Sequence, residues 1–104
     1  MSAAADAAAG AIQSVTNLRA SLMRVRGQRQ VRAMGERRSL AQVSNDWFNR
    51  YRPAISRISS VRLDSADASF GELLESSERA PSRASCTATL QALRHELISI
   101  RTQV

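Results

Sequence analysis

The sequence predicts an all-α protein: a small helical bundle or an elongated helical hairpin of three to five helices, two of them long. Apolar residues recur at intervals of three and four positions, which is the helical period. Sustained alternation of apolar and polar residues is missing, and the chain contains no Asn-Gly or Asp-Gly hairpin turn. The 104 residues are expected to form a single domain.

The first helix is predicted over residues 10–34. Its apolar residues step by four and three along a heptad seam: Ala11, Val15, Leu18, Leu22 and Val25. The next two positions of that register are Arg29 and Arg32. Gly27 and Gly35 each cost about 1 kcal/mol relative to alanine in a helix interior. The helix is therefore expected to pack in its first half and to bend or become exposed in its second.

A second helix is predicted over residues 36–52. Its inner stripe is apolar and aromatic: Leu40, Val43, Trp47 and Tyr51. Pro53 disfavours helical geometry in the residue before it, so a boundary or kink is expected at this point. A short helix over residues 54–61 is expected to follow.

Two segments are expected to lie outside the helices. The Ala-rich residues 1–9 are expected to be flexible, and residues 62–68, which are rich in Asp, Ser and Ala, are expected to form an internal linker. Ser69 and Glu72 then have the spacing of a capping box, in which each side chain binds the other residue's backbone amide. A short helix is predicted from there to about Arg79.

The last helix has the most regular pattern. Pro81 and Ser82 are expected to open it, since proline is tolerated in the first turn. Six residues then step by four and three: Cys86, Leu90, Leu93, Leu97, Ile100 and Val104. About 22 residues at 1.5 Å each make a rod of roughly 33 Å. Because an isolated helix of this length is marginal, the seam is expected to be a core contact or an oligomer contact.

Positive charge is confined to the first half of the chain. There are fifteen Arg and no Lys. Residues 1–52 hold nine Arg against three acids, which gives +6, whereas residues 53–104 hold six of each. Such a block attracts polyanions, and the forked guanidinium donors match phosphate or carboxylate. The predicted nucleic-acid-binding residues are Arg19, Arg24, Arg26, Arg29, Arg32, Arg37, Arg38, Arg50 and Arg52.

The basic and aromatic features each have a second interpretation. The arginines could instead pair with acids of a partner protein or of the same chain, and a preference for Arg over Lys is also typical of a GC-rich genome. Trp47 and Tyr51, which lie one turn apart beside Arg50 and Arg52, could stack on unpaired bases. The sequence favours a core or interface role for them, because the chain has only four aromatic residues.

The sequence argues against an enzyme. The only Cys and His, Cys86 and His95, lie nine residues apart, on opposite faces of one helix and about 13 Å apart along it. They cannot form a nucleophile–base pair within one chain. No metal site or cofactor is expected, because converging ligands and a Gly-rich phosphate loop are both missing from the sequence. Glu72, Glu75 and Glu78 favour a solvated helix face.

The sequence therefore predicts a non-enzymatic small subunit of a larger assembly that binds nucleic-acid backbone through residues 19–38. The alternative is a helical adaptor or oligomerisation module that binds an acidic protein partner through its heptad seam and Arg-rich surface. A homo-oligomer or a hetero-complex is expected in either case. No apolar run approaches the ~20 residues of a membrane helix. A cytoplasmic location is expected, with an organellar protein carrying an Arg-rich transit peptide as the alternative.

Overall fold

The computed structural model describes residues 2–24, 29–79 and 82–104, and for 29–34, 36 and 83 it describes the backbone alone. The described residues form an all-helical bundle, which confirms the predicted fold class. The elements in chain order are α1 (Ala3–Arg24), α2 (Arg29–Asp46), the π-helical turn η1 (Trp47–Tyr51), α3 (Arg52–Ile58), α4 (Asp64–Glu78) and α5 (Arg83–Gln103).

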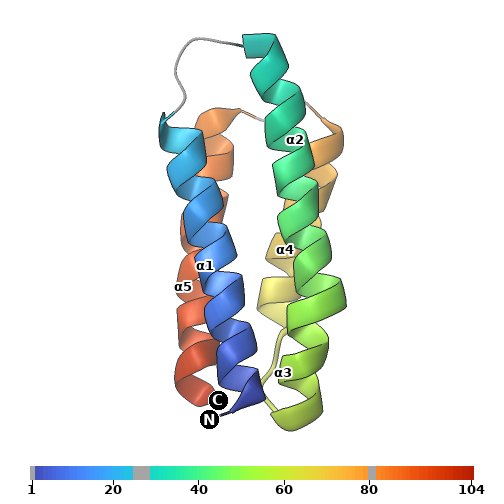
Figure 1. Cartoon of the computed structure of the whole chain (residues 1–104), viewed down its shortest axis with the longest axis vertical. Helices are drawn as coiled ribbons and strands as arrows, with labels where there is room; N and C mark the ends of the chain where they lie inside the picture. Colours follow the sequence, from blue (N-terminus) through green and yellow to red (C-terminus); the bar gives the residue numbers. More distant parts are fainter. Residues whose placement is uncertain (1, 25–28, 80–81) are drawn as a thin grey trace.

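Successive rods of the bundle run in opposite directions (Figure 1). Helix α1 rises from the N-terminus, α2, η1 and α3 descend as one rod, α4 rises and α5 descends. Helix α1 stands beside α5, and α2 stands beside α4 (Figure 1). The described residues span 43 × 22 × 17 Å, so the molecule is an elongated antiparallel bundle with both termini at one end.

Helix α1 begins at Ala3, so residues 3–9 are helical and not part of a flexible segment as predicted. The buried residues of α1 step by four and three along its whole length: Ala4, Ala8, Ala11, Val15, Leu18 and Leu22. Alanine has the highest helix propensity, and its small side chain lets a neighbouring helix approach closely. The helix ends at Arg24, and residues 29–34 belong to α2, so the helix predicted over 10–34 is divided between two rods.

The rod that follows passes Pro53 without a break. The Arg52 amide donates to the carbonyl of Trp47, which is the five-residue step of a π-helix. Proline lacks an amide hydrogen and its ring crowds the carbonyl four residues earlier, so a wider turn just before it relieves the clash. The boundary or kink expected at Pro53 is therefore a π-helical turn inside a continuous rod that ends at Ile58.

Helix α4 corrects two predictions. It begins at Asp64, so most of residues 62–68 is helix rather than linker, and Leu63 is an N-cap without a side-chain hydrogen bond. Asp64 and Asp67 lie in the first turn, where carboxylates are stabilised by the positive end of the helix dipole. Ser69 is consequently an interior residue and not part of a capping box. Its hydroxyl donates instead to Glu96 of α5, at 3.1 Å.

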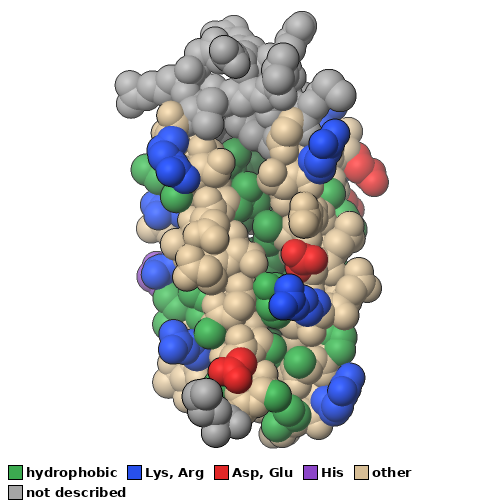
Figure 2. All heavy atoms as spheres, viewed as in Figure 1, with side chains coloured by type: hydrophobic (Ala, Val, Ile, Leu, Met, Phe, Trp, Pro, Cys, Tyr) green, Lys and Arg blue, Asp and Glu red, His purple; other side chains and the backbone are tan. Residues whose placement is uncertain are grey.

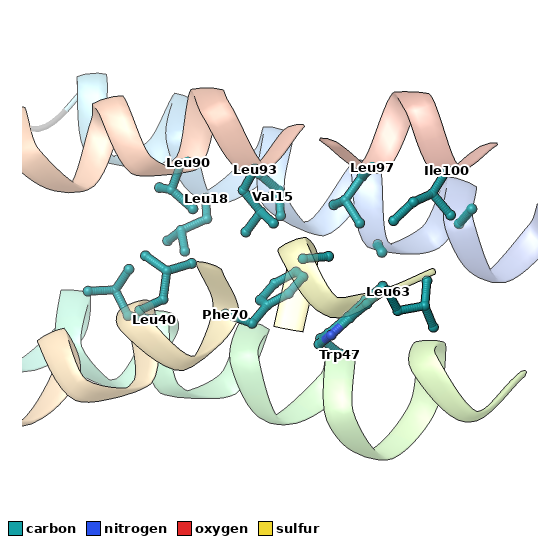
Figure 3. Close-up of a cluster of buried hydrophobic side chains, with 14 of the residues drawn as sticks. Val15, Leu18, Leu40, Trp47, Leu63, Phe70, Leu90, Leu93, Leu97 and Ile100 are labelled. Carbon is teal, nitrogen blue, oxygen red and sulfur yellow. The ribbon is translucent and has the colours of Figure 1, made fainter. Parts of the chain in front are cut away.

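Helix α5 begins after Ser82, whose hydroxyl accepts the Ser85 amide at 3.2 Å, while Pro81 lies outside the described residues. Five of its seam residues are buried within the chain: Cys86, Leu90, Leu93, Leu97 and Ile100. Figure 3 shows Leu90, Leu93, Leu97 and Ile100 beside α1 side chains, facing the rods that carry Leu40, Trp47 and Phe70. The seam is therefore core. Large apolar side chains that are exposed among the described residues are scattered: Met23, Ile58 and Ile98.

Candidate nucleic-acid interface

Part of the predicted Arg block lies in the half of the bundle where α1 and α2 are joined. Arg24 lies in the last turn of α1, and Arg38 lies near the middle of α2, nine residues after its start. Both side chains are exposed. Among the described residues, no carboxylate forms an ion pair with either of them. Arg24 donates through Nε to the carbonyl of Ala20 in its own helix, at 3.4 Å. The described residues therefore supply neither guanidinium group with a counter-charge.

Arg19 and Arg37 are half-buried in the same half of the bundle. The Nη2 atom of Arg19 donates to Oε1 of Gln91 on α5, at 3.2 Å. The Nε atoms of Arg19 and Arg37 are both buried and find no hydrogen-bond partner within the described part of the chain. These two arginines lie along helix contacts, and only part of each could reach a ligand. Arg26 and the side chains of Arg29 and Arg32 lie outside the described residues.

Arg50 and Arg52 do not belong to the basic end. Twelve residues separate Arg38 from Arg50, or about 18 Å along the rod. Arg52 donates through Nε to both carboxylate oxygens of Asp67, at 2.9 and 2.8 Å. The Arg50 guanidinium lies 5.4 Å from the centre of the Tyr51 ring. The structure therefore divides the predicted set of nine arginines into separate groups.

Trp47 is a core residue and cannot stack on a base, which confirms the interpretation that the sequence favoured. It is fully buried and stacks on Phe70, with ring centroids 4.8 Å apart and planes 15° apart. Its Nε1 donates to Oδ1 of Asp67 at 2.8 Å. Asp67 thus joins Trp47 and Arg52, and this carboxylate anchors η1 and the start of α3 to α4.

Tyr51 fastens the same turn to α1. Its ring lies against Gly10, where a Cβ would come within 2.7 Å of the ring. Its hydroxyl lies 3.3 Å from the hydroxyl of Ser14. The half-buried Tyr51 side chain therefore packs within the bundle, and this packing requires that residue 10 has no side chain.

A furrow of about 330 Å³ runs between α1 and α2. Its polar lining is hydroxyl, amide and one carboxylate: Ser14, Asn17, Ser21, Ser39, Gln42 and Asp46. Leu18 and Val43 supply its apolar surface. In Figure 2, which shows this face, side chains that are neither apolar nor charged flank the hollow and apolar side chains appear inside it. We call this feature the α1–α2 furrow.

The furrow was not predicted from the sequence, although its pattern is present in the chain. Ser14, Asn17 and Ser21 step by three and four beside the apolar seam of α1, and Ser39, Gln42 and Asp46 do the same on α2. Each stripe alone is typical of a solvated helix face. Only the packing of the two helices shows that the stripes face each other.

The residues considered for catalysis do not converge. Cys86 is buried and His95 is exposed on the same helix. Within the described residues, no group of three or more His, Cys, Asp or Glu side chains is placed to hold a metal ion. Glu72, Glu75 and Glu78 are exposed, as expected of a solvated face. The helices of the described ranges include none with the length and apolar character to cross a membrane.

The fold and these features define a small antiparallel helical bundle with a basic end and a polar furrow between its first two helices. No family model, no curated protein and no solved structure matches the chain. The function is therefore argued from its own residues.

Proposed function

We propose that the chain is a non-enzymatic helical subunit that binds the sugar–phosphate backbone of nucleic acid through its basic end. The observation that carries this proposal is the pair formed by Arg24 and Arg38. They are exposed on neighbouring helices in one half of the bundle, and neither has an acidic partner among the described residues. Forked, fully charged guanidinium groups bind the oxygens of phosphate or carboxylate in a bidentate way, and phosphate is the group that a nucleic-acid backbone repeats.

The whole-chain charge favours the same ligand. The chain carries a formal charge of +6, and all of the excess lies in residues 1–52. The arginines of the second half are balanced by acids, including the exposed pair of Arg62 and Asp64. A polyanion would therefore be attracted to the first half of the chain, and the attraction would weaken with salt.

The alternative function is an adaptor that binds a protein partner through its heptad seam and its Arg-rich surface, and burial of the seam supports it less. Five of the six residues assigned to that seam are buried in the core, so a partner could reach these five only if the bundle opened. An acidic protein surface remains a competitor for the exposed arginines. A binding experiment with a defined nucleic acid separates the two ligands.

The test is a fluorescence-anisotropy titration of a labelled DNA duplex at about 50 and 200 mM salt. We expect the Arg24→Gln/Arg38→Gln variant to bind more weakly, with the salt slope reduced by roughly 0.9 for each phosphate that is no longer neutralised. The matched control is Arg57→Gln/Arg101→Gln, which removes the same charge from exposed positions elsewhere in the bundle. The control is expected to retain most of the affinity and the slope.

Two results would contradict the proposal. If the wild-type protein binds neither the duplex nor a single strand of the same length at low salt, nucleic acid is not its ligand, and an acidic protein surface becomes the better hypothesis. If both double variants weaken binding equally, net charge alone is responsible and Arg24 and Arg38 do not form a site.

A further inference from the structure

We infer that the α1–α2 furrow receives an unpaired nucleobase, so that the protein prefers single-stranded nucleic acid to duplex. This inference rests on the proposed function, because it assumes that the arginines of the basic end hold the phosphates. It adds the form of the nucleic acid and the class of base. Three features of the molecule support it: the lining of the furrow, its position beside the arginines, and the charge at Asp46.

The lining suits the edge of a base. Hydroxyl and amide groups both donate and accept hydrogen bonds, as the edges of bases do. Gln13 donates through its amide nitrogen to Oδ1 of Asn17 at 2.8 Å, and this bond leaves the Asn17 amino group as a donor. Leu18 and Val43 provide apolar contact for the face of a ring. The volume of about 330 Å³ is at the small end of ligand pockets, which suits one base rather than a stacked series.

The furrow lies directly beside the basic end. On α1, Arg24 follows Ser21 by three residues, which places the two side chains on neighbouring turns of one face. On α2, Arg38 precedes Gln42 by four residues, with the same consequence. A strand whose phosphates contact these arginines would therefore carry its next base over the furrow. A duplex cannot present a base in this way, since its bases are paired and stacked.

Asp46 indicates which bases the furrow accepts. A carboxylate accepts hydrogen bonds and repels phosphate, so it favours a group with N–H donors. Adenine, cytosine and guanine carry exocyclic amino groups, whereas thymine and uracil offer only a ring N–H between two carbonyl oxygens, which a carboxylate repels. The same carboxylate would repel the acidic side chains of a protein partner. The furrow is therefore matched to an amino-bearing base rather than to an acidic peptide.

The test compares labelled homopolymers of deoxyadenosine, deoxycytidine and thymidine with a duplex of the same length, by fluorescence anisotropy at about 50 mM salt. We expect the adenine and cytosine strands to bind more tightly than the thymine strand and the duplex. The Asn17→Ala/Gln42→Ala variant is expected to lose about tenfold in affinity for the adenine and cytosine strands, the effect of one or two hydrogen bonds, and to bind the duplex unchanged. The Asp46→Asn variant should lose the preference against thymine.

The control is Gln103→Ala, which deletes an exposed amide from the C-terminal end of α5. It should bind every probe as the wild type does, and a thermal melt confirms that each variant is folded. Equal affinity of the wild type for all four probes would overturn the inference while leaving phosphate binding intact. Full single-strand affinity in the Asn17→Ala/Gln42→Ala variant would overturn it as well. Failure of every probe to bind would instead remove the proposed function.

Discussion

Helix α1 packs against α5 through an unbroken apolar seam, but it faces the rod of α2, η1 and α3 across a surface that is only partly closed. Along α5, leucines meet the alanines and aliphatic residues of α1, and water is excluded. On the side of α1 that faces the other rod, Tyr51 of η1 packs against Gly10 and closes the contact. Further along the same side, the α1–α2 furrow leaves the surface between the two helices open.

The difference shows that helix α1 contributes one set of residues to the core and another set to the surface. The seam residues of α1 and the furrow residues alternate along the same turns, so Leu18 borders both surfaces. The apolar contact with α5 supplies the burial that holds the bundle together. This leaves the opposite flank free to keep hydroxyl and amide groups hydrated, which a core position would not tolerate without hydrogen-bond partners.

The largest expected effect on stability is at the apolar seam between α1 and α5. Leu97 is fully buried, so Leu97→Ala should lower the free energy of unfolding by about 2–5 kcal/mol, because apolar burial decreases and a cavity is left behind. Chemical denaturation followed by circular dichroism measures this. The neighbouring Ile98→Ala, at a residue that is 37% exposed, should change the value by about 0.5 kcal/mol or less. Equal effects would mean that the seam is not the stabilising contact.

The polar anchor of η1 is expected to rank next. Asp67→Ala removes the acceptor of the buried Trp47 indole and the partner of Arg52, and should cost roughly 2 kcal/mol of unfolding free energy. Asp64→Ala is the matched control, because Asp64 lies in the same first turn but pairs with Arg62 in full exposure to solvent. Its cost should be about 0.5 kcal/mol. A thermal melt in which the two variants coincide would show that η1 does not depend on Asp67.

The contact of α1 with Tyr51 is tested by substitutions at two glycines, which are expected to change the free energy of unfolding in opposite directions. Gly10→Ala gains helix propensity but drives a methyl group into the Tyr51 ring, so unfolding free energy should fall by about 1 kcal/mol overall. Gly71→Ala, in the interior of α4, would meet no described atom within 4 Å and should gain about 1 kcal/mol. Urea titration measures both.

A double variant, Gly10→Ala with Tyr51→Ala, checks the cause. If the ring is the obstacle, Gly10→Ala should no longer be destabilising once the ring is removed, and the two changes should not be additive. Additive costs would place the strain somewhere other than the Tyr51 contact.

The smallest expected effect concerns the hydroxyl groups of α2. The Oγ of Ser44 is buried and has no hydrogen-bond partner among the described residues, so Ser44→Ala should raise the free energy of unfolding by about 1 kcal/mol. Ser39→Ala, whose hydroxyl lines the hydrated furrow, should gain only the roughly 0.5 kcal/mol of helix propensity. Denaturation curves of the two variants, each compared with that of the wild type, separate the two gains in unfolding free energy. A decrease in the stability of Ser44→Ala would mean that its hydroxyl is satisfied.

Sequence reasoning predicted the helices better than their ends. The spacing of Leu90, Leu93 and Leu97 predicted α5 because helical period is a local property of the chain. The start of α4 was placed six residues late, because the predicted N-cap was Ser69, from its capping-box spacing with Glu72, and the observed N-cap is Leu63. The start of α1 was missed because the seam was counted only from Ala11, although Ala4 and Ala8 continue the same spacing.

The candidate site was predictable only in part. The excess of arginine in the first half is visible in the sequence, since charge is a matter of composition. The antiparallel course of the helices places the end of α1 beside α2, and it brings Arg52 to Asp67 of α4. These placements decide which arginines are paired with an acid. Spacing along one helix says nothing about which face the next helix covers.

The sequence by itself determined that this protein is all-helical, that its last helix carries a continuous apolar seam, and that its positive charge lies in one half. Periodicity and composition decide these properties residue by residue. Only the tertiary structure decided that the seam is filled within the chain, that Trp47 is buried on Phe70, and that two ordinary polar stripes form one furrow. These depend on contacts between residues distant in the chain, which form only when the packing of whole helices excludes water from some faces and leaves it on others.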